Sequence, residues 1–260
     1  MTPSALDRLD EIAAMMGRRR LAVFLDYDGT LTPIVSHPEK ALLSDSMRTT
    51  LRALAARAPV AILSGRDLYD MRQRVRVEGI VYAGSHGFDI AGPHGLRKQM
   101  ASEFLPVLDA AEKELGERLA GISGALLERK RFSIAAHYRQ VADESVPQVE
   151  QAVHEVAARH RELRKMSGKK VYELQPAIDW DKGKALLWLL EVMDSKSREI
   201  FPIYIGDDLT DEDAFHAIEQ CGLGIIVIEG PRTTAAHFML KNPGEVERFL
   251  RELTARLRLS

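Results

Sequence analysis

The stretch LAVFLDYDGTLT at residues 21–32 constrains the fold of this chain more than any other. Five apolar residues, 21–25, lead directly into Asp26 and Asp28, and Gly29 follows. A short apolar run that ends at a turn signal is typical of a strand buried on both faces of a sheet. Residues just past such a strand lie at its carboxyl end, where open α/β sheets bind their ligands. We therefore expect a functional site around Asp26 and Asp28.

The two carboxylates of this stretch need a partner. Side chains alternate along an extended chain, so Asp26 and Asp28 are expected to project the same way. Two such charges about 4 Å apart repel by roughly 4 kcal/mol at an effective dielectric of 20. A cation, a shared proton or use of the second acid as a proton donor would offset that repulsion. The alternative is an Asp-Gly turn closing a hairpin, which Pro33 and Pro38 disfavour because no matching strand follows.

Further apolar runs repeat the same layout. Residues 60–63 lead into Ser64, residues 79–83 lead into a glycine-rich loop, and residues 200–205 lead into an acidic loop. Helical patterns lie between these runs, and this alternation predicts an α/β fold with a parallel sheet. Because the carboxyl ends of parallel strands lie on one edge, the polar loops can converge there.

Residues 103–177 interrupt this pattern. Two helical stretches, a short strand at 171–174 and alternating apolar residues within 126–138, which indicate one antiparallel strand, suggest a small α+β unit. We therefore predict a Rossmann-like parallel-sheet core formed by residues 1–102 and 178–260, with residues 103–177 inserted as a second domain.

Composition limits the class of protein. The 260 residues are 45% apolar and 28% charged with a net charge of −2, which gives no basic field for nucleic acid. The single cysteine, Cys221, excludes an internal disulfide and fits a reducing compartment. No apolar run reaches the roughly 18 residues of a membrane span, and the amino terminus lacks a signal-peptide pattern. We therefore expect a cytoplasmic protein that binds neither membrane nor nucleic acid.

The acidic loop at residues 207–213 holds five acids in seven residues. Acids favour the amino end of a helix, which accounts for Glu212 and Asp213 but not for Asp207 and Asp208 directly after a buried strand. The spacing does not fit an EF-hand calcium loop. Hard oxygen ligands with room for water and phosphate suit Mg²⁺.

Lys182 and Ser64 each have a functional and a plain interpretation. Lys182 lies where a helix is expected to begin, where a cation costs about 0.3–1 kcal/mol unless a phosphate or a carboxylate lies nearby. The plain interpretation is a surface lysine. Ser64 and neighbouring amides would suit an anion, whereas the plain interpretation is a helix cap.

Four stretches together resemble the motifs of the haloacid dehalogenase-like phosphatases. They are DYDGTLTP at 26–33, SGR at 64–66, WDKGKAL at 180–186 and GDDLTDEDAF at 206–215. The first and last of these, with GSHG at 84–87, look specifically like the trehalose-6-phosphate phosphatase family. The resemblance implies a Mg²⁺-dependent hydrolysis of trehalose 6-phosphate to trehalose and phosphate through an aspartyl-phosphate. It also implies a functional link to a trehalose-phosphate synthase.

The resemblance assigns roles to the core residues. Asp26 would be the nucleophile, and Asp28 would protonate the leaving sugar oxygen and then activate water. Lys182 would balance the charge, with Lys184 as the alternative. The metal ligands would be Asp26, the backbone carbonyl of Asp28, and Asp207, supported by Asp208 or Asp211.

The resemblance also assigns substrate contacts. The inserted unit would be the family's cap domain, which closes over the sugar and excludes water. Contacts to phosphate or sugar would come from Ser64, Tyr27, Thr30 and Arg66 in the core and from Glu128, Lys130, Arg139, Lys169 and Glu173 in the cap. The alternative for the cap residues is that they simply face solvent.

Other functions stay open beside this one. The nearest is a phosphatase of another sugar phosphate, such as sucrose phosphate or a mannosyl phosphoglycerate, and a phosphomutase is a further enzyme class. A non-catalytic sugar-phosphate sensor belongs to a different class, and the presence of every expected catalytic residue argues against it.

Overall fold

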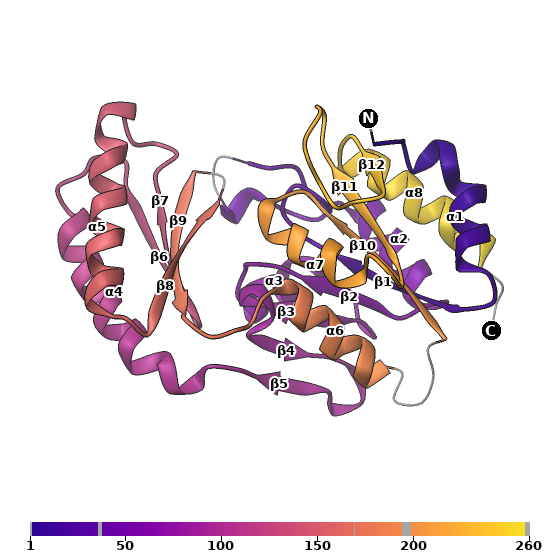
Figure 1. The fold of residues 1–260 in the computed structure, drawn as a ribbon, viewed down its shortest axis with the longest axis horizontal. Coiled ribbons are helices and arrows are strands. Elements are labelled where there is room, and N and C mark those ends of the chain that lie inside the picture. The colour runs from indigo at the N-terminus through magenta and orange to yellow at the C-terminus, as the bar shows by residue number, and fades with distance from the viewer. Residues whose placement is uncertain (1, 36–37, 169, 194–198, 258–260) are drawn as a thin grey trace. The chain divides into compact units, whose positions relative to one another are not determined.

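The computed structural model describes residues 2–35, 38–168, 170–193 and 199–257. The chain divides into two compact units (Figure 1). Unit 1 consists of Met1–Lys98 and Trp180–Ser260, and unit 2 consists of Gln99–Asp179. The sequence places the inserted domain at 103–177, so the two divisions differ by a few residues at each end. Within the described residues, no helix is both long and apolar enough to cross a bilayer.

Unit 1 is built on an eight-stranded sheet with the order β12-β11-β10-β1-β2-β3-β4-β5. From β12 through β3 neighbouring strands are parallel, and β4 is antiparallel to β3. The strands are β1 (Arg20–Leu25), β2 (Val60–Leu63), β3 (Val81–Gly84), β4 (Asp89–Ala91), β5 (Arg97–Gln99), β10 (Ile200–Gly206), β11 (Leu223–Val227) and β12 (Phe238–Leu240). The predicted α/β architecture is therefore confirmed.

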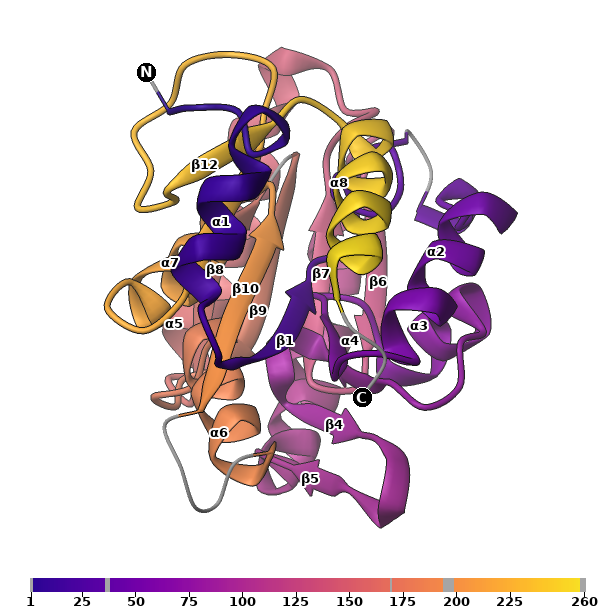
Figure 2. The same ribbon diagram turned by 90° about the vertical axis from the view of Figure 1, so that its right-hand side faces the viewer.

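Helices cover this sheet in two groups. They are α1 (Leu9–Met16), α2 (Asp45–Ala55), α3 (Leu68–Val75), α6 (Lys182–Met193), α7 (Glu212–Ile218) and α8 (Pro243–Arg256). Figure 2 shows α2, α3 and α8 on one side of β1 and β10 and α7 on the other. Alternation along β10 explains this: Ile203 and Ile205 join the core with α2 and α8, whereas the ring of Tyr204 packs edge-on against Phe215 of α7.

Unit 2 is an α+β unit, as expected. Its four strands form an antiparallel sheet of order β6-β7-β9-β8, and one face packs on two helices. The elements are α4 (Leu105–Leu119), β6 (Leu126–Lys130), β7 (Ser133–His137), α5 (Val146–Arg159), β8 (Leu163–Gly168) and β9 (Val171–Pro176). The expectation of a single strand within 126–138 is wrong, because a turn at Arg131 and Phe132 divides it into the hairpin β6–β7. A two-residue turn preserves the alternation of apolar residues and therefore hides the break.

Candidate active site

Three polar loops meet at one edge of the sheet of unit 1. Strand β1 pairs in parallel with β10 on one side and with β2 on the other, so their carboxyl ends lie together. Asp26, Ser64 and Asp207 directly follow these strands and are all buried. This convergence is what the sequence predicts for the edge where an α/β sheet binds ligands.

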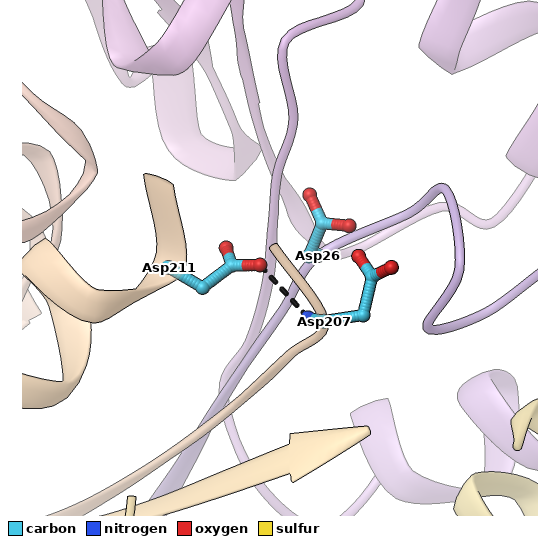
Figure 3. A group of neighbouring side chains, drawn as sticks. All are labelled: Asp26, Asp207 and Asp211. Atoms are coloured by element: carbon cyan, nitrogen blue, oxygen red, sulfur yellow. Dashed lines mark hydrogen bonds between the residues drawn. The ribbon is translucent and has the colours of Figure 1, made fainter. Parts of the chain in front are cut away.

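Asp26, Asp207 and Asp211 form a buried group of acids (Figure 3). One carboxylate oxygen of each lies within 4.8 Å of those of the other two. Gly29 makes room for this arrangement: its φ is +86°, and a Cβ atom there would lie 2.1 Å from Oδ2 of Asp207. Any other residue would therefore displace the Asp207 carboxylate or strain the backbone.

Lys182, the first residue of α6, holds two of these acids. Its Nζ atom lies 2.7 Å from Oδ1 of Asp26 and 2.7 Å from Oδ1 of Asp211, and only 3% of its side chain is exposed. Nζ of Lys184 lies 3.8 Å from Asp181 on a partly exposed side chain. The geometry therefore selects Lys182 over Lys184 as the lysine of the site.

Asp211 anchors the acidic loop rather than offering a free ligand. Its Oδ1 accepts hydrogen bonds from Lys182 and from the hydroxyl of Tyr204, which lies at 2.6 Å. Its Oδ2 accepts the backbone N–H groups of Asp207 and Asp208, both at 2.8 Å. Four donors satisfy this fully buried carboxylate, so we assign it the positioning of the loop.

Burial and charge shift the pKa values of this group in opposite directions. Burial raises the pKa of Asp26 well above its usual range, and the charges of Asp211 and Asp207 add to this effect against that of Lys182. Burial acts the same way on Asp211, but the charge and the hydrogen bond of Lys182 outweigh it and lower the pKa of that carboxyl. Crowded acids of this kind favour a bound cation.

The Asp28 carboxylate has a different partner. Nε and Nη2 of Arg66 bind its two oxygens in a fork, each at 2.7 Å. Nη1 of Arg66 lies 2.9 Å from Oδ2 of Asp70, and Nε of Arg74 donates to both oxygens of Asp70. Asp28 therefore lies outside the acid group, and its side chain is 40% exposed.

The other predicted core residues are found at the same edge with different surroundings. The Thr30 hydroxyl is buried and has no hydrogen-bond partner among the residues that the structure describes. Oγ of Ser64 accepts the backbone N–H of Arg66 at 3.2 Å. Tyr27 is wholly buried in the core, and its hydroxyl donates to the carbonyl of Ala41. The Tyr27 ring is therefore part of the core, and a contact of this residue with substrate stays a prediction.

Asp208 takes a local role. Its Oδ1 accepts the backbone N–H of Leu209, and with Asp211 it forms a reciprocal capping pair for the turn at Leu209–Asp211. A side chain used in this way starts the helical segment that carries Asp211. It supports the acid group through the backbone rather than by entering it.

Polar residues predicted in the inserted unit gather on the sheet face of unit 2 that is turned away from its helices. Nζ of Lys130 lies 2.9 Å from Glu173, which also accepts the Ser133 hydroxyl. Glu128 lies 2.7 Å from Nε2 of His137, and that hydrogen bond lowers the pKa of Glu128. Arg139 follows β7 in a turn and is exposed. Lys169 lies outside the described residues.

Three residues of the site escaped the sequence analysis. Tyr204 lies within an apolar strand run, where its hydroxyl gives no signal. Asp70 and Arg74 lie one turn apart on α3, and Arg66, four residues before Asp70, lies just ahead of that helix. Opposite charges that alternate every four residues favour ion pairs, so this spacing is a signal in the sequence that could have identified Asp70 and Arg74.

Comparison with known proteins supports one family. A family model described as trehalose-phosphatase matches residues 24–243. The chain is 42% identical to a probable trehalose-phosphate phosphatase 3 of Oryza sativa over 96% of this chain and 74% of that protein. It is 45% identical to a trehalose-phosphate phosphatase of Mycobacterium tuberculosis over 98% of this chain and 66% of that protein. The chain thus spans about two thirds to three quarters of these relatives.

A solved structure has the same fold. The C-terminal domain of the Candida albicans trehalose-6-phosphate phosphatase superposes with a TM-score of 0.86 at 24% identity, covering 99% of this chain and 100% of that one. At this identity the likeness concerns the fold alone.

Proposed function

The chain belongs to the trehalose-phosphatase family of phosphoric monoester hydrolases, with the haloacid dehalogenase-like fold, and we propose that it hydrolyses trehalose 6-phosphate to trehalose and inorganic phosphate. The observation that carries the proposal is the buried contact of Lys182 with Asp26. It lies at the sheet edge where the loops that begin with Ser64 and Asp207 also start. A carboxylate oriented by a lysine beside further acids is the arrangement expected of a nucleophile in phosphoryl transfer.

The proposed reaction has two steps. A carboxylate oxygen of Asp26 attacks phosphorus, the bond from phosphorus to the sugar oxygen breaks, and Asp28, which enters this step as the carboxylic acid, gives its proton to that oxygen as trehalose leaves. Water then attacks the aspartyl-phosphate, Asp28 takes a proton from this water, and phosphate leaves as the Asp26 carboxylate is regenerated. One residue thus serves as acid and then as base, which contributes typically about 10²–10⁴-fold.

Other residues hold the reactants. Lys182 orients the attacking carboxylate and offsets its charge. We propose that the hydroxyls of Thr30 and Ser64 bind phosphoryl oxygens. The buried hydroxyl of Thr30, which has no partner within the described part of the chain, supports this role, because a polar group of that kind costs about 1–3 kcal/mol unless a ligand satisfies it.

Mg²⁺ fits the acid group. Asp26 and Asp207 offer hard oxygen ligands, whereas both oxygens of Asp211 already accept hydrogen bonds. Burial and the neighbouring acids raise the pKa of Asp26, and a bound cation would act against this by favouring the carboxylate form. When bound, the ion would stabilise charge on the phosphoryl oxygens. We propose that Asp26, the Asp28 carbonyl and Asp207 hold it.

We further propose that unit 2 is the family's cap domain and that its polar sheet face binds sugar hydroxyls. Glu128, Lys130 and Glu173 lie on that face, and Arg139 and Lys169 are assigned by the resemblance. Replacement of Glu128 with Gln is expected to raise KM for trehalose 6-phosphate, while exposed Glu144→Gln serves as the control.

We also propose that the protein is cytoplasmic and that it is functionally linked to a trehalose-phosphate synthase.

A panel of sugar phosphates tests the function. Phosphate release is measured from trehalose 6-phosphate, sucrose 6-phosphate and mannosyl phosphoglycerate, each with Mg²⁺ and with EDTA. The proposal expects release from trehalose 6-phosphate alone, its loss in EDTA and its loss in Asp26→Asn. Preferred hydrolysis of another sugar phosphate would reassign the substrate, and binding without release would indicate a sensor.

A further inference from the structure

A chain of ion pairs begins at Asp28, continues through side chains just before and along α3, and ends at the backbone of Glu39. Arg66 uses Nε and Nη2 on Asp28 and Nη1 on Asp70. Arg74 holds Asp70 in turn through Nε, and its Nη1 donates to the carbonyl of Glu39 at 2.9 Å. We propose that Asp70 is a positioning residue, which through Arg66 orients the carboxyl group of Asp28, the group that gives its proton as the acid and takes one as the base. This inference rests on the proposed function.

Asp28 needs such support because its surroundings alone do not fix it. Its side chain is 40% exposed, whereas that of Arg66 is only 10% exposed. The guanidinium carbon of Arg66 lies 5.3 Å from the centre of the Tyr27 ring, which packs in the core. The orientation of Asp28 is therefore set by a nearly buried fork that matches both carboxylate oxygens.

The direction of that fork depends on Asp70. An arginine side chain has several rotatable bonds, so contact with a second carboxylate restricts the tilt of its guanidinium. Asp70 occupies the remaining terminal nitrogen of Arg66 and is itself fixed by two contacts from Arg74. Arg74 is itself only 13% exposed and also donates to the backbone carbonyl of Glu39, which gives its side chain a second contact.

Orientation matters more for Asp28 than for a simple ligand. Its proton must reach the sugar oxygen as the bond to phosphorus breaks, and a displacement of about 1 Å at a reacting group can cost about 10²-fold. Arg66 joins Asp70 to Asp28, since its Nη1 binds Asp70 and its Nη2 binds Asp28. Its loss should therefore affect proton donation and leave the attack of Asp26 intact.

Leaving-group dependence separates these steps. A sugar oxygen must be protonated as it departs, whereas p-nitrophenolate leaves without a proton donor. The value of kcat/KM covers only steps up to departure of the leaving group, so slow hydrolysis of the phosphoenzyme does not affect it. We compare kcat/KM for trehalose 6-phosphate and p-nitrophenyl phosphate in the full chain, in Asp70→Asn and in the matched control Asp45→Asn, which breaks an exposed Asp–Arg pair on α2.

The expected result is a selective loss. Asp70→Asn lowers kcat/KM for trehalose 6-phosphate roughly 10-fold, mainly through kcat, and leaves the p-nitrophenyl phosphate value within about twofold; Asp45→Asn changes neither. Asp70→Glu, which retains the charge, recovers part of the loss. In an Asp28→Asn background, Asp70→Asn causes no further loss with trehalose 6-phosphate, because the group it orients is already gone.

Equal losses with both substrates, or a full additional loss in the Asp28→Asn background, would overturn the inference. If Asp70→Asn does not fold, as judged by circular dichroism, Arg74→Lys replaces it with the same expectations, since lysine loses the two-point contact with Asp70. An unmodified chain that releases no phosphate from any sugar phosphate would instead refute the proposed function, so the two failures are distinguishable.

Discussion

The ammonium nitrogen of Lys182 lies 2.7 Å from Oδ1 of Asp26, although 156 residues separate them in the sequence. The same nitrogen lies 2.7 Å from Asp211. One buried lysine at the start of α6 therefore contacts both the residue that follows β1 and the turn that follows β10. The contact that orients the proposed nucleophile is also a contact on which the fold of unit 1 depends.

Loss of the Asp211 carboxylate should destabilise the protein. Asp211→Asn leaves Lys182 buried with one acid partner, and breaking a buried ion pair costs about 3–5 kcal/mol. The lowered pKa of Asp211 means that its stabilisation is present at neutral pH and is lost as the pH falls through and below its ordinary value. Urea unfolding followed by circular dichroism measures the difference at pH 7 and again near pH 3.

The exposed Asp10→Asn is the control for this prediction, with no expected change. The free energy of unfolding of Asp211→Asn should approach that of the unmodified chain in acid. A loss at pH 7 of less than about 1 kcal/mol, the range of surface pairs, or a gap that widens in acid would contradict the assignment.

Mg²⁺ should stabilise the folded chain through Asp207. A ligand that binds only the folded state at about 100 times its Kd adds about 2.7 kcal/mol, which raises Tm. Asp207→Asn removes one of the two carboxylates of the acid group that we propose as metal ligands, and the rise in Tm on adding Mg²⁺ should then largely disappear. Differential scanning calorimetry with Mg²⁺ and with EDTA measures both.

Asp213→Asn provides the matched control, because this exposed acid of the same segment lies outside the acid group. It should keep the full rise in Tm. A rise that survives in Asp207→Asn, or none in the unmodified chain, would remove the metal from the proposal.

Thr30→Val should separate stability from function. Valine has nearly the shape of threonine but lacks the buried hydroxyl, for which the described ranges offer no partner. The free energy of unfolding should therefore stay constant or rise by about 1–3 kcal/mol. The same change should raise KM for trehalose 6-phosphate, because a phosphoryl oxygen loses its donor. Chemical denaturation and steady-state kinetics are measured on the same preparation.

Thr50→Val tests the reasoning behind that prediction. The Thr50 hydroxyl is also buried, but it donates to the carbonyl of Ser46 at 3.1 Å. This variant should lose stability slightly and keep KM. A Thr30→Val variant that is less stable with an unchanged KM would mean that its hydroxyl serves the fold.

The parts predicted well from sequence are those where one local pattern fixes the position. An apolar run followed by a polar residue defines both a parallel strand and the sheet edge, which located Asp26, Ser64 and Asp207 together. Choosing Lys182 over Lys184 needed the structure, because both lie near the start of α6 and only the fold decides which one is buried.

Partners that depend on tertiary packing could not be predicted. Alternation along a strand suggested that Asp26 and Asp28 point the same way, but the chain turns after β1, and Arg66 binds Asp28 instead. Tyr27 was assigned to substrate from its place in a motif, whereas its large ring fills the core. A motif gives a residue's neighbours in sequence, and packing decides where its side chain lies.

The most direct test of the mechanism is to trap the phosphoenzyme. Asp28→Asn is mixed with p-nitrophenyl phosphate and Mg²⁺, so that the leaving group needs no proton donor while hydrolysis of the intermediate is slow. After an acid quench, peptide mass mapping locates the added phosphoryl group. We predict that it lies on Asp26 and is absent in Asp26→Asn/Asp28→Asn. A phosphoryl group on another residue, or product formation with no covalent intermediate, would contradict the assignment of Asp26 as nucleophile.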